Sequence, residues 1–486
     1  MMFKLRPEKP VALGFGAALL PVATLVGLLA ASFYLFGDSA ALGPNQIALV
    51  FSALVAMYIA WRHGHSVEAL GAAAVASVTT AVSALFILLG VGALIGTWAL
   101  SGTLMAMVYY GLQLLNPDYF YVTSCVICAV VAASIGSSWT VAGTIGIGLM
   151  GVAESMGLSP AITAGAVISG AYFGDKSSPL SDTANLACAA AGSNLYDHVK
   201  ESLWTSVPAL LLAFGIFLTF GSGGEFDTSK VTSFIDDMFH PSVWHFLPLL
   251  LVLVLAIMRW PPFVTIFIGA MAGGLMAALL APERAIAFAD AANLPGWLAI
   301  IKGVWASLAT GYVSNTGYPA VDTLLTRGGM SSMLSTVWLI LVALAFGGIV
   351  EKAGILERLL GPLIAAAKST GALVGTVVGA AVSTNLLASD QYIAIVLPGR
   401  MMKPAFEKRG LAPVVLSRAL GDSATVTSAL IPWNSCGAYM AATLGVGTIA
   451  FAPYCFFNLL NPLISVLFAI LGIRMLRAPG TDRKKA

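Results

Sequence analysis

Apolar segments long enough to cross a lipid bilayer recur along this chain of 486 residues. A spanning helix needs about 20 consecutive apolar residues. Clear examples cover residues 11–36, 46–61, 203–220, 246–258 with the run after Pro262, and 454–473. Only 9% of the residues are charged, against roughly 25% in soluble domains. The sequence therefore predicts an all-α, polytopic membrane protein, whose first apolar run is too long for a cleaved signal and stays as a span.

The distribution of charge predicts the orientation of the chain. Basic residues gather before residue 10, at Arg62 and after residue 473, whereas residues 221–241 carry an acidic excess that includes Glu225, Asp227, Asp236 and Asp237. Because cytoplasmic loops are enriched in Lys and Arg, we expect both termini in the cytoplasm and the acidic loop outside, in a cell (inner) membrane. The net charge of +2 gives no reason to expect a nucleic-acid partner.

The chain repeats itself at an offset of 253 residues. Without gaps, residues 123–195 match residues 376–448, so that Pro160 falls on Pro413 and Pro179 on Pro432. The copies differ in charge: residues 146–157 hold one charged residue, Glu154, whereas the matching 399–410 hold five. The basic loop is predicted to be cytoplasmic and its counterpart is not, which is typical of inverted-topology repeats.

This repeat predicts the organisation of the chain. We expect N-terminal spans in 1–66, a first inverted repeat in 67–200, and linking spans with the acidic external loop in 201–310. A second inverted repeat is expected in 311–453, followed by a last span and a basic tail in 454–486. Polar interruptions at 134–140 and 383–392 are predicted to be the tips of re-entrant hairpins.

A polar stretch at 173–185, FGDKSSPLSDTAN, predicts a broken helix and a functional site. Pro179, like its counterpart Pro432, removes an amide donor and disfavours helix at the residue before it. Irregular backbone at membrane depth is tolerated only inside protein or along a wet cavity, and ionisable residues there are usually functional. We therefore expect Asp175, Asp182, Asp390 and Asp422 to form a site for an alkali cation, with further oxygen ligands from Ser137, Ser138, Thr183, Asn185, Thr425, Ser428 and Asn434.

Lys176 is a candidate charge partner or substrate contact in the same stretch. The alternative for these charges is an interfacial loop or a local Asp175–Lys176 salt bridge. At the offset of 253, each acid falls on a serine of the other copy, which suits two ion sites of unequal charge: Asp390 on Ser137, Asp422 on Ser169, Asp175 on Ser428 and Asp182 on Ser435.

Other chemistries have little support in the sequence. The five cysteines all lie in apolar or small-residue stretches, and the CxxC at Cys125 and Cys128 has no accompanying ligands for a metal. GAYFGDKS has the length of a phosphate loop, but Asp175 stands where the glycine is required. The five histidines fall near the ends of spans, which argues against an intramembrane enzyme, and no cofactor is expected. Glu351 and Lys352 are expected at the membrane interface.

The same polar blocks resemble the NhaC family of Na+/H+ antiporters, within the larger ion-transporter superfamily. The matching stretches are 92–103, 169–187, 322–356, 388–401 and 416–445, among which DKSSPLSD and PWN are specific strings. The resemblance implies exchange of Na+ for H+, with the four aspartates in the family's polar motifs. Gly421 and Ala424 depart from the pattern, in which an acid precedes Asp422 and a glycine follows Ser423.

The mechanism predicted is alternating access, in which Na+ and H+ compete for buried carboxylates. Burial favours the protonated form of an acid, so the same group can hold either ion. The alternative within transport is Na+- or H+-coupled exchange of a small organic acid or amino acid, such as malate or lactate, with Lys176 receiving its carboxylate. An ion channel or an intramembrane enzyme fits the paired breaks less well. The oligomeric state is open, and a homodimer is among the states considered.

Overall fold

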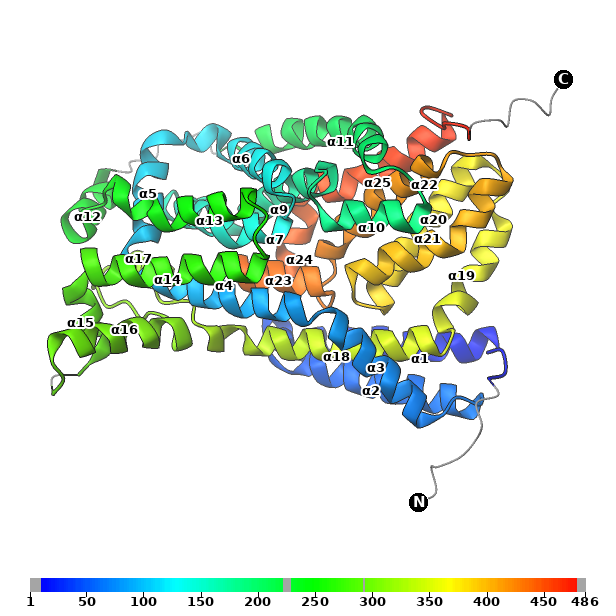
Figure 1. The fold of residues 1–486 in the computed structure, drawn as a ribbon, viewed down its shortest axis with the longest axis horizontal. Coiled ribbons are helices and arrows are strands. Elements are labelled where there is room, and N and C mark those ends of the chain that lie inside the picture. The colour runs from blue at the N-terminus through cyan, green and yellow to red at the C-terminus, as the bar shows by residue number, and fades with distance from the viewer. Residues whose placement is uncertain (1–9, 222–228, 292, 479–486) are drawn as a thin grey trace, which may run out of the picture.

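The computed structural model describes residues 10–221, 229–291 and 293–478, which form helices, turns and two isolated β-bridges (Figure 1). Within these residues, eight helices are long and apolar enough to cross a membrane, and three bent helix pairs raise the number to eleven if each is one span. The all-α polytopic class is thereby confirmed. The N-terminal basic residues, Glu225, Asp227 and the end of the basic tail lie outside the described residues.

One layer of the molecule is built from the long helices that flank the repeats. It contains α1 (Phe15–Phe36), α2 (Pro44–Arg62), α3 (Val67–Thr80), α4 (Val82–Ser101), α14 (Pro262–Leu280), α16 (Gly296–Thr310) and α18 (Leu334–Lys352). α3 and α2 pack along α18, while α14 packs along α4. The shorter helices α5 (Thr103–Leu114), α12 (Ser229–Phe239), α15 (Pro282–Ala289), α17 (Pro319–Leu325) and α19 (Ile355–Ala366) connect them.

The apolar run that begins at Phe246 is not one extended span. It forms α13 (Leu247–Ile257) and the separate helix α14, which pack against each other. The chain turns between them at Arg259, whose φ is +62°, and at the pair Pro261–Pro262. Proline cannot continue the preceding helix. The chain therefore reverses its direction here, although hydropathy alone favoured one extended span.

The internal repeat appears in the boundaries of the helices. α10 (Asp182–Ala191) and α23 (Ser435–Leu444) begin and end 253 positions apart. In the first copy α7 (Ser138–Val141), a π-helical turn (Ala142–Gly146) and α8 (Ile147–Ser155) correspond to the single helix α21 (Gln391–Lys408) of the second. α6 (Phe120–Ile135) corresponds to α20 (Thr370–Leu387), and α9 (Pro160–Ser177) to α22 (Pro413–Leu420) with the π-helical Gly421–Thr425.

The two copies run in opposite directions. Glu154, at the end of α8, pairs with Arg327, which follows α17. In the other copy Arg409, just after α21, donates to the carbonyl of Ala367 at the end of α19. Figure 1 places α17 and α19 at opposite ends of the long axis. The inverted topology is thereby confirmed.

The correspondence continues past the boundaries of 200 and 453 expected from the sequence. α11 (Leu195–Leu218) matches two consecutive helices, α24 (Thr448–Phe451) and α25 (Phe456–Ile470). The segment that begins with α24 meets α25 at a bend of 55°. α11 packs on α22 of the other copy, and α25 packs on α9 in return. Such an exchange of partners is what a two-fold relation between the copies requires.

Candidate functional site

Each predicted proline break lies where a helix of the repeat is interrupted. α9 ends at Ser177 and α10 begins at Asp182, with Pro179 between them. Ser178, just before the proline, has the extended conformation (φ −96°, ψ 134°) that this position favours. The second break, with Pro432, separates Leu430 from α23.

The tip of the first hairpin touches the first break. Gly136 ends α6 with φ +79°, and a Cβ at this position would lie 2.6 Å from the carbonyl carbon of Leu180. Its counterpart in the second copy, Ser389, has φ +58°, so both hairpin tips turn through the same left-handed conformation. The close approach brings the hairpin tip and the break around one carboxylate, that of Asp175.

Asp175 is buried, with 4% of its surface exposed, and fully hydrogen-bonded. Its Oδ2 accepts hydrogen bonds from Ser138 Oγ (2.6 Å) and Ser138 N (3.3 Å). Its Oδ1 accepts from Ser181 Oγ (2.6 Å) and Thr183 Oγ1 (3.4 Å). The hairpin tip and the start of α10 therefore converge on this side chain.

A cavity of about 210 Å³ lies beside these groups. Three of the four predicted acids line it, together with hydroxyls from both repeats: Asp175, Asp182, Asp390, Ser137, Ser138, Thr183 and Ser435. Its wall also contains Trp139, Gln391, Tyr392 and Cys436, and no Lys, Arg or His side chain is among the described residues that line it. The structure thus brings three carboxylates to one enclosed, oxygen-rich space.

The other two acids of the cavity are fixed by the second repeat. Asp390 caps the N-terminus of α21, where its Oδ1 accepts from Ile393 N at 2.9 Å. Asp182 Oδ2 accepts a hydrogen bond of 2.6 Å from the hydroxyl of Tyr392. One side chain of each repeat is therefore oriented by a neighbour on α21.

Four predicted ligands are not among the described residues that line this cavity: Asn185, Thr425, Ser428 and Asn434. Asn185 Nδ2 donates to the Ser181 carbonyl (2.7 Å), and Ser428 Oγ donates to the Thr425 carbonyl (2.7 Å). Asn434 caps α23 by accepting from Cys436 N at 3.0 Å. These side chains satisfy backbone groups at the breaks, which is where an interrupted helix most needs hydrogen-bond partners.

Asp422, the fourth predicted acid, is absent from the described lining of the cavity because it pairs with Lys176. The two side chains form a salt bridge and are 0% and 1% exposed. Asp422 Oδ1 also accepts from Thr205 Oγ1 (2.8 Å) and Asn461 Nδ2 (3.0 Å). Consecutive residues of a helix point about 100° apart, so Asp175 and Lys176 reach different neighbours and do not form the local pair considered above.

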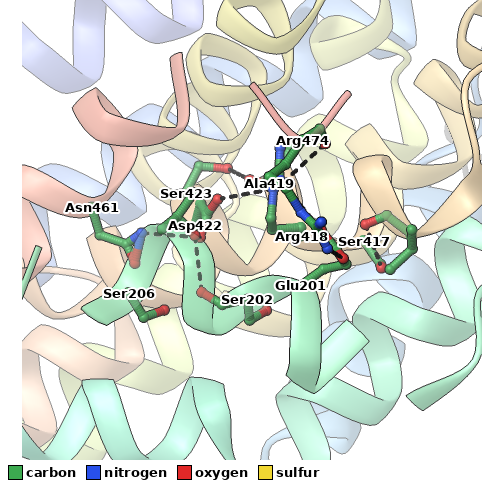
Figure 2. Close-up of polar contacts among 12 residues, drawn as sticks. Glu201, Ser202, Ser206, Ser417, Arg418, Ala419, Asp422, Ser423, Asn461 and Arg474 are labelled. Carbon is green, nitrogen blue, oxygen red and sulfur yellow. Dashed lines mark hydrogen bonds and ion pairs between the residues drawn. The ribbon is translucent and has the colours of Figure 1, made fainter. Parts of the chain in front are cut away.

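The ion pair continues into a charged network that the sequence had not indicated. Arg418 lies between Asp422 (3.9 Å) and Glu201 (3.7 Å), as Figure 2 shows, and Glu201 also binds Arg474. Arg474 is 31% exposed, whereas Arg418 is 1% exposed. The spacing of Arg418 and Asp422, four residues apart in an apolar stretch, was the available signal.

A second cavity, of about 810 Å³, adjoins the first and shares Thr80, Asp390 and Tyr392 with it. Charged residues from the end of α18 and the middle of α21 line it, among them Glu351, Lys352 and Arg400. We call this second cavity the funnel. Glu351 and Lys352 belong to its wall, a role that an interfacial position alone did not indicate.

On the other side of the small cavity, two aromatic rings close the space. Trp139 and Tyr439 stack with centroids 3.9 Å apart and planes inclined by 13°, and the Tyr439 hydroxyl donates to the Trp139 carbonyl at 2.8 Å. Beyond α23 lies a third cavity, of about 1150 Å³, lined by Pro432, Ala438 and Thr448 among others. Trp139 lines the acidic cavity, and Ala438, the neighbour of Tyr439 on α23, lines the third one.

Comparisons with known proteins agree with these features. A model of the Na+/H+ antiporter family matches residues 170–473. The chain is 34% identical over 472 residues to the Na+/H+ antiporter NhaC of Alkalihalophilus pseudofirmus, covering 96% of this chain and 97% of that protein.

Two further relatives carry names with other substrates. The malate-2H+/Na+-lactate antiporter of Bacillus subtilis is 32% identical, covering 88% of this chain and 90% of that protein. The arginine/ornithine antiporter ArcD of Halobacterium salinarum is also 32% identical, covering 96% and 94%. The family match extends over more than half of the sequence and includes both proline breaks and all four aspartates, and the chain belongs to the Na+/H+ antiporter family.

Proposed function

We propose that this protein exchanges Na+ for H+ across the cell membrane by alternating access. Its relatives include proteins named Na+/H+ antiporter NhaC. The observation that carries the proposal is the cavity of about 210 Å³, which three carboxylates line without a basic side chain among its described residues. Such a space favours a small cation.

Asp175, Asp182 and Asp390 are the proposed charge of the cation site. The hydroxyls of Ser137, Ser138 and Thr183 line the same cavity and supply neutral oxygens. Hard cations prefer such carboxylate and hydroxyl ligands. Because burial also favours protonation of an acid, proton uptake in the cavity competes with the cation.

An organic anion is the second candidate, since one relative is named a malate/lactate antiporter. A carboxylate substrate needs a positive partner, and Lys176 was the candidate. Its ammonium is neutralised by Asp422 and hydrogen-bonded to Ser206 Oγ (2.6 Å) and Asn461 Oδ1 (2.9 Å). An arginine-like substrate carries a carboxylate too and meets the same obstacle. These contacts favour the inorganic cation.

The orientation follows from the charge at the two ends of the molecule. Lys352 and Arg400 line the funnel, and Figure 1 shows the described ends of the chain at the same end of the long axis as α19. By the positive-inside rule this end is cytoplasmic, which gives an inward-open state in an inner membrane. One chain supplies both repeats and hence the whole cavity, so a homodimer is not needed to complete the site.

The test is transport by purified protein in proteoliposomes with an internal pH dye. Pulses of Na+, Li+, K+, malate, lactate and arginine are compared at the same imposed pH gradient. Na+ should collapse the gradient, and the Asp175→Asn variant should not respond. A response to an organic acid in the absence of Na+, with none to Na+ itself, would overturn the proposal.

A further inference from the structure

His198 is a buried ionisable group that the cation cavity does not use. It lies on α11 with no exposed surface. Its Nδ1 is 3.1 Å from Ser417 Oγ, and its Nε2 is 3.4 Å from Ser202 Oγ. Both ring nitrogens therefore face hydroxyls, which allows the imidazole to take a proton on one side and release it on the other.

The hydroxyls continue outward from His198 to the surface. Ser193 Oγ donates to Ser417 Oγ at 2.8 Å and is itself only half-buried, in the turn between α10 and α11. The adjacent Gly192 lies beside Lys403, since a Cβ there would be 2.9 Å from Lys403 Nζ. Lys403 lies on α21, in the basic segment 399–410, so this end of the chain of hydroxyls is on the basic side of the protein.

Polar groups also continue inward to Asp422, where the contact between Ser202 and Thr205 is made by the Ser202 backbone carbonyl. Thr205, one turn after Ser202 on α11, donates to the Ser202 carbonyl (3.0 Å) and to Asp422 Oδ1 (2.8 Å). Figure 2 shows Asp422 to the left of Arg418 and Ser417 to its right, with Ser202 below. A polar route thus joins the surface at Ser193 to the Lys176–Asp422 pair, without passing through the lining of the funnel.

One atom at the inner end of this route has no hydrogen bond. Asp422 Oδ2 is fully buried and accepts no hydrogen bond from the described residues, and Arg418 Nε, 3.9 Å away, likewise donates none. A buried, unpaired carboxylate oxygen is costly unless it acquires a proton. Asp422 Oδ2 belongs to the same carboxylate as Oδ1, on which the route ends through Thr205.

The repeat shows that this route is not a requirement of the fold. At the offset of 253, His198 falls on Phe451, and the pair Arg418 and Glu201 falls on Gly165 and Tyr454. Gly165 packs directly on Tyr454, whose carbonyl oxygen would lie 2.5 Å from a Cβ at Gly165. The same place in the other copy is thus apolar and closely packed, so the polar version is specific to the basic side.

We propose that the proton exchanged for Na+ travels by this route, through His198 to Asp422, apart from the path of the cation. The inference rests on the proposed function. A proton arriving from Ser417 binds Nδ1 of the ring, and Nε2 releases its own proton to Ser202 Oγ. Rotation of the Ser202 hydroxyl passes a proton to Thr205 Oγ1, and Thr205 gives its own proton to Asp422 Oδ1, which gains an O–H bond. The carboxylate becomes a neutral acid.

This protonation explains the coupling. Once Asp422 is neutral, the Lys176 ammonium has lost its counter-charge. Because Lys176 follows Asp175 on α9, its uncompensated positive charge disfavours Na+ in the cavity through space, without a contact between the two side chains. One positive charge enters the interior as another departs, so the net buried charge stays the same. The charges that face His198 from neighbouring helices are Lys176, Arg418 and Asp422, with Glu201 and Arg474 beyond Arg418.

The first experiment compares two fluxes in proteoliposomes carrying His198→Gln. Na+-driven proton movement should fall by about a hundredfold, the lower end of what a positioned acid–base group contributes. Exchange of labelled for unlabelled Na+, which moves no net proton, should stay near the wild-type rate. The matched control is His63→Gln, at the end of α2 away from the route. Equal loss of both fluxes, or loss of neither, would overturn the inference.

The second experiment measures Na+ binding by calorimetry as a function of pH. The double variant Lys176→Met/Asp422→Asn removes both charges together, so that none is left unpaired. We expect Na+ still to bind, with an affinity that depends less steeply on pH between 6 and 9 than in wild type, because only the carboxylates of the cavity still take up protons. Unchanged pH dependence, or loss of Na+ binding in the folded variant, would contradict the separate proton site. If wild-type protein exchanged no Na+ for H+, the proposed function would fail instead.

Discussion

The hydroxyl of Tyr392 donates a hydrogen bond of 2.6 Å to Asp182 Oδ2, from one repeat to the other. Tyr392 lines both the funnel and the acidic cavity, so this bond lies where the two meet. At the offset of 253 its counterpart is Trp139, which stacks on Tyr439 on the opposite side of the cavity. The same position in each repeat thus controls one side of the cavity, and only the Trp139 side is closed.

Removing the Tyr392 hydroxyl is expected to strengthen Na+ binding. A hydrogen bond to a charged group contributes about 1.5–3 kcal/mol. In the Tyr392→Phe variant the Asp182 carboxylate has lost this bond, so only a bound cation can replace the lost stabilisation. The apparent KM for Na+ should fall by about tenfold, and turnover should fall with it because release is slower. The dependence of proton flux on Na+ concentration measures both.

The matched control is Tyr196→Phe, on α11, whose ring is 75% exposed. It should behave as wild type. A KM for Na+ that rises or stays unchanged in Tyr392→Phe would show that the hydroxyl does not restrain Asp182 in the transport cycle.

Removing one ring of the Trp139–Tyr439 pair should expose the cavity to the external side of the membrane. Cys436 lines the cavity and is 1% exposed. In Trp139→Ala, a membrane-impermeant maleimide added from the outside should label the protein, whereas wild type should stay unlabelled. Adding Cys436→Ser to Trp139→Ala should abolish the label. Absence of labelling in Trp139→Ala, in folded protein, would mean that the stack is not the closure.

The carboxylates of the cavity should matter more than the serines that match them in the repeat. Asp175→Asn, Asp182→Asn and Asp390→Asn each remove charge from the cation site, so Na+-driven proton flux should be abolished. Ser428→Ala, Ser435→Ala and Ser137→Ala remove only a hydroxyl and should retain most of the flux. Near-normal exchange in all three Asn variants, with normal insertion, would show that the acids are structural.

Ser137 and Asp390 illustrate how far the sequence predicted this site. Both cap the N-terminus of a helix, Ser137 by accepting from Thr140 N at 3.2 Å and Asp390 from Ile393 N at 2.9 Å. The proline breaks, the hairpin tips and the match between Ser137 and Asp390 are local features that recur at a fixed offset. They could therefore be predicted from the order of residues in the sequence alone. Three of the four acids were assigned to the observed cavity.

The position of Asp422 could not be predicted in the same way. Its partner Lys176 is 246 positions away in the sequence, and the direction of each side chain depends on how α9 is rotated against α11 and α22. The Tyr392–Asp182 bond likewise joins residues 210 positions apart. Pairings of this kind are set by packing of the repeats rather than by local pattern, which is why Arg418, Glu201 and His198 were not assigned to any site.

The Arg418–Glu201 pair gives a prediction about stability that is independent of transport. Removing one partner of a buried ion pair costs about 3–5 kcal/mol, whereas replacing both by neutral groups of similar size costs little. Arg418→Met leaves Glu201, only 5% exposed, with Arg474 alone, while Asp422 loses its neighbour at 3.9 Å. The melting temperature of the detergent-solubilised protein should therefore fall markedly in Arg418→Met and recover in large part in Arg418→Met/Glu201→Gln. As a control, Lys302→Met, on the exposed face of α16, should leave the melting temperature unchanged. A double variant no more stable than Arg418→Met would show that Arg418 is held by Asp422 and packing rather than by Glu201.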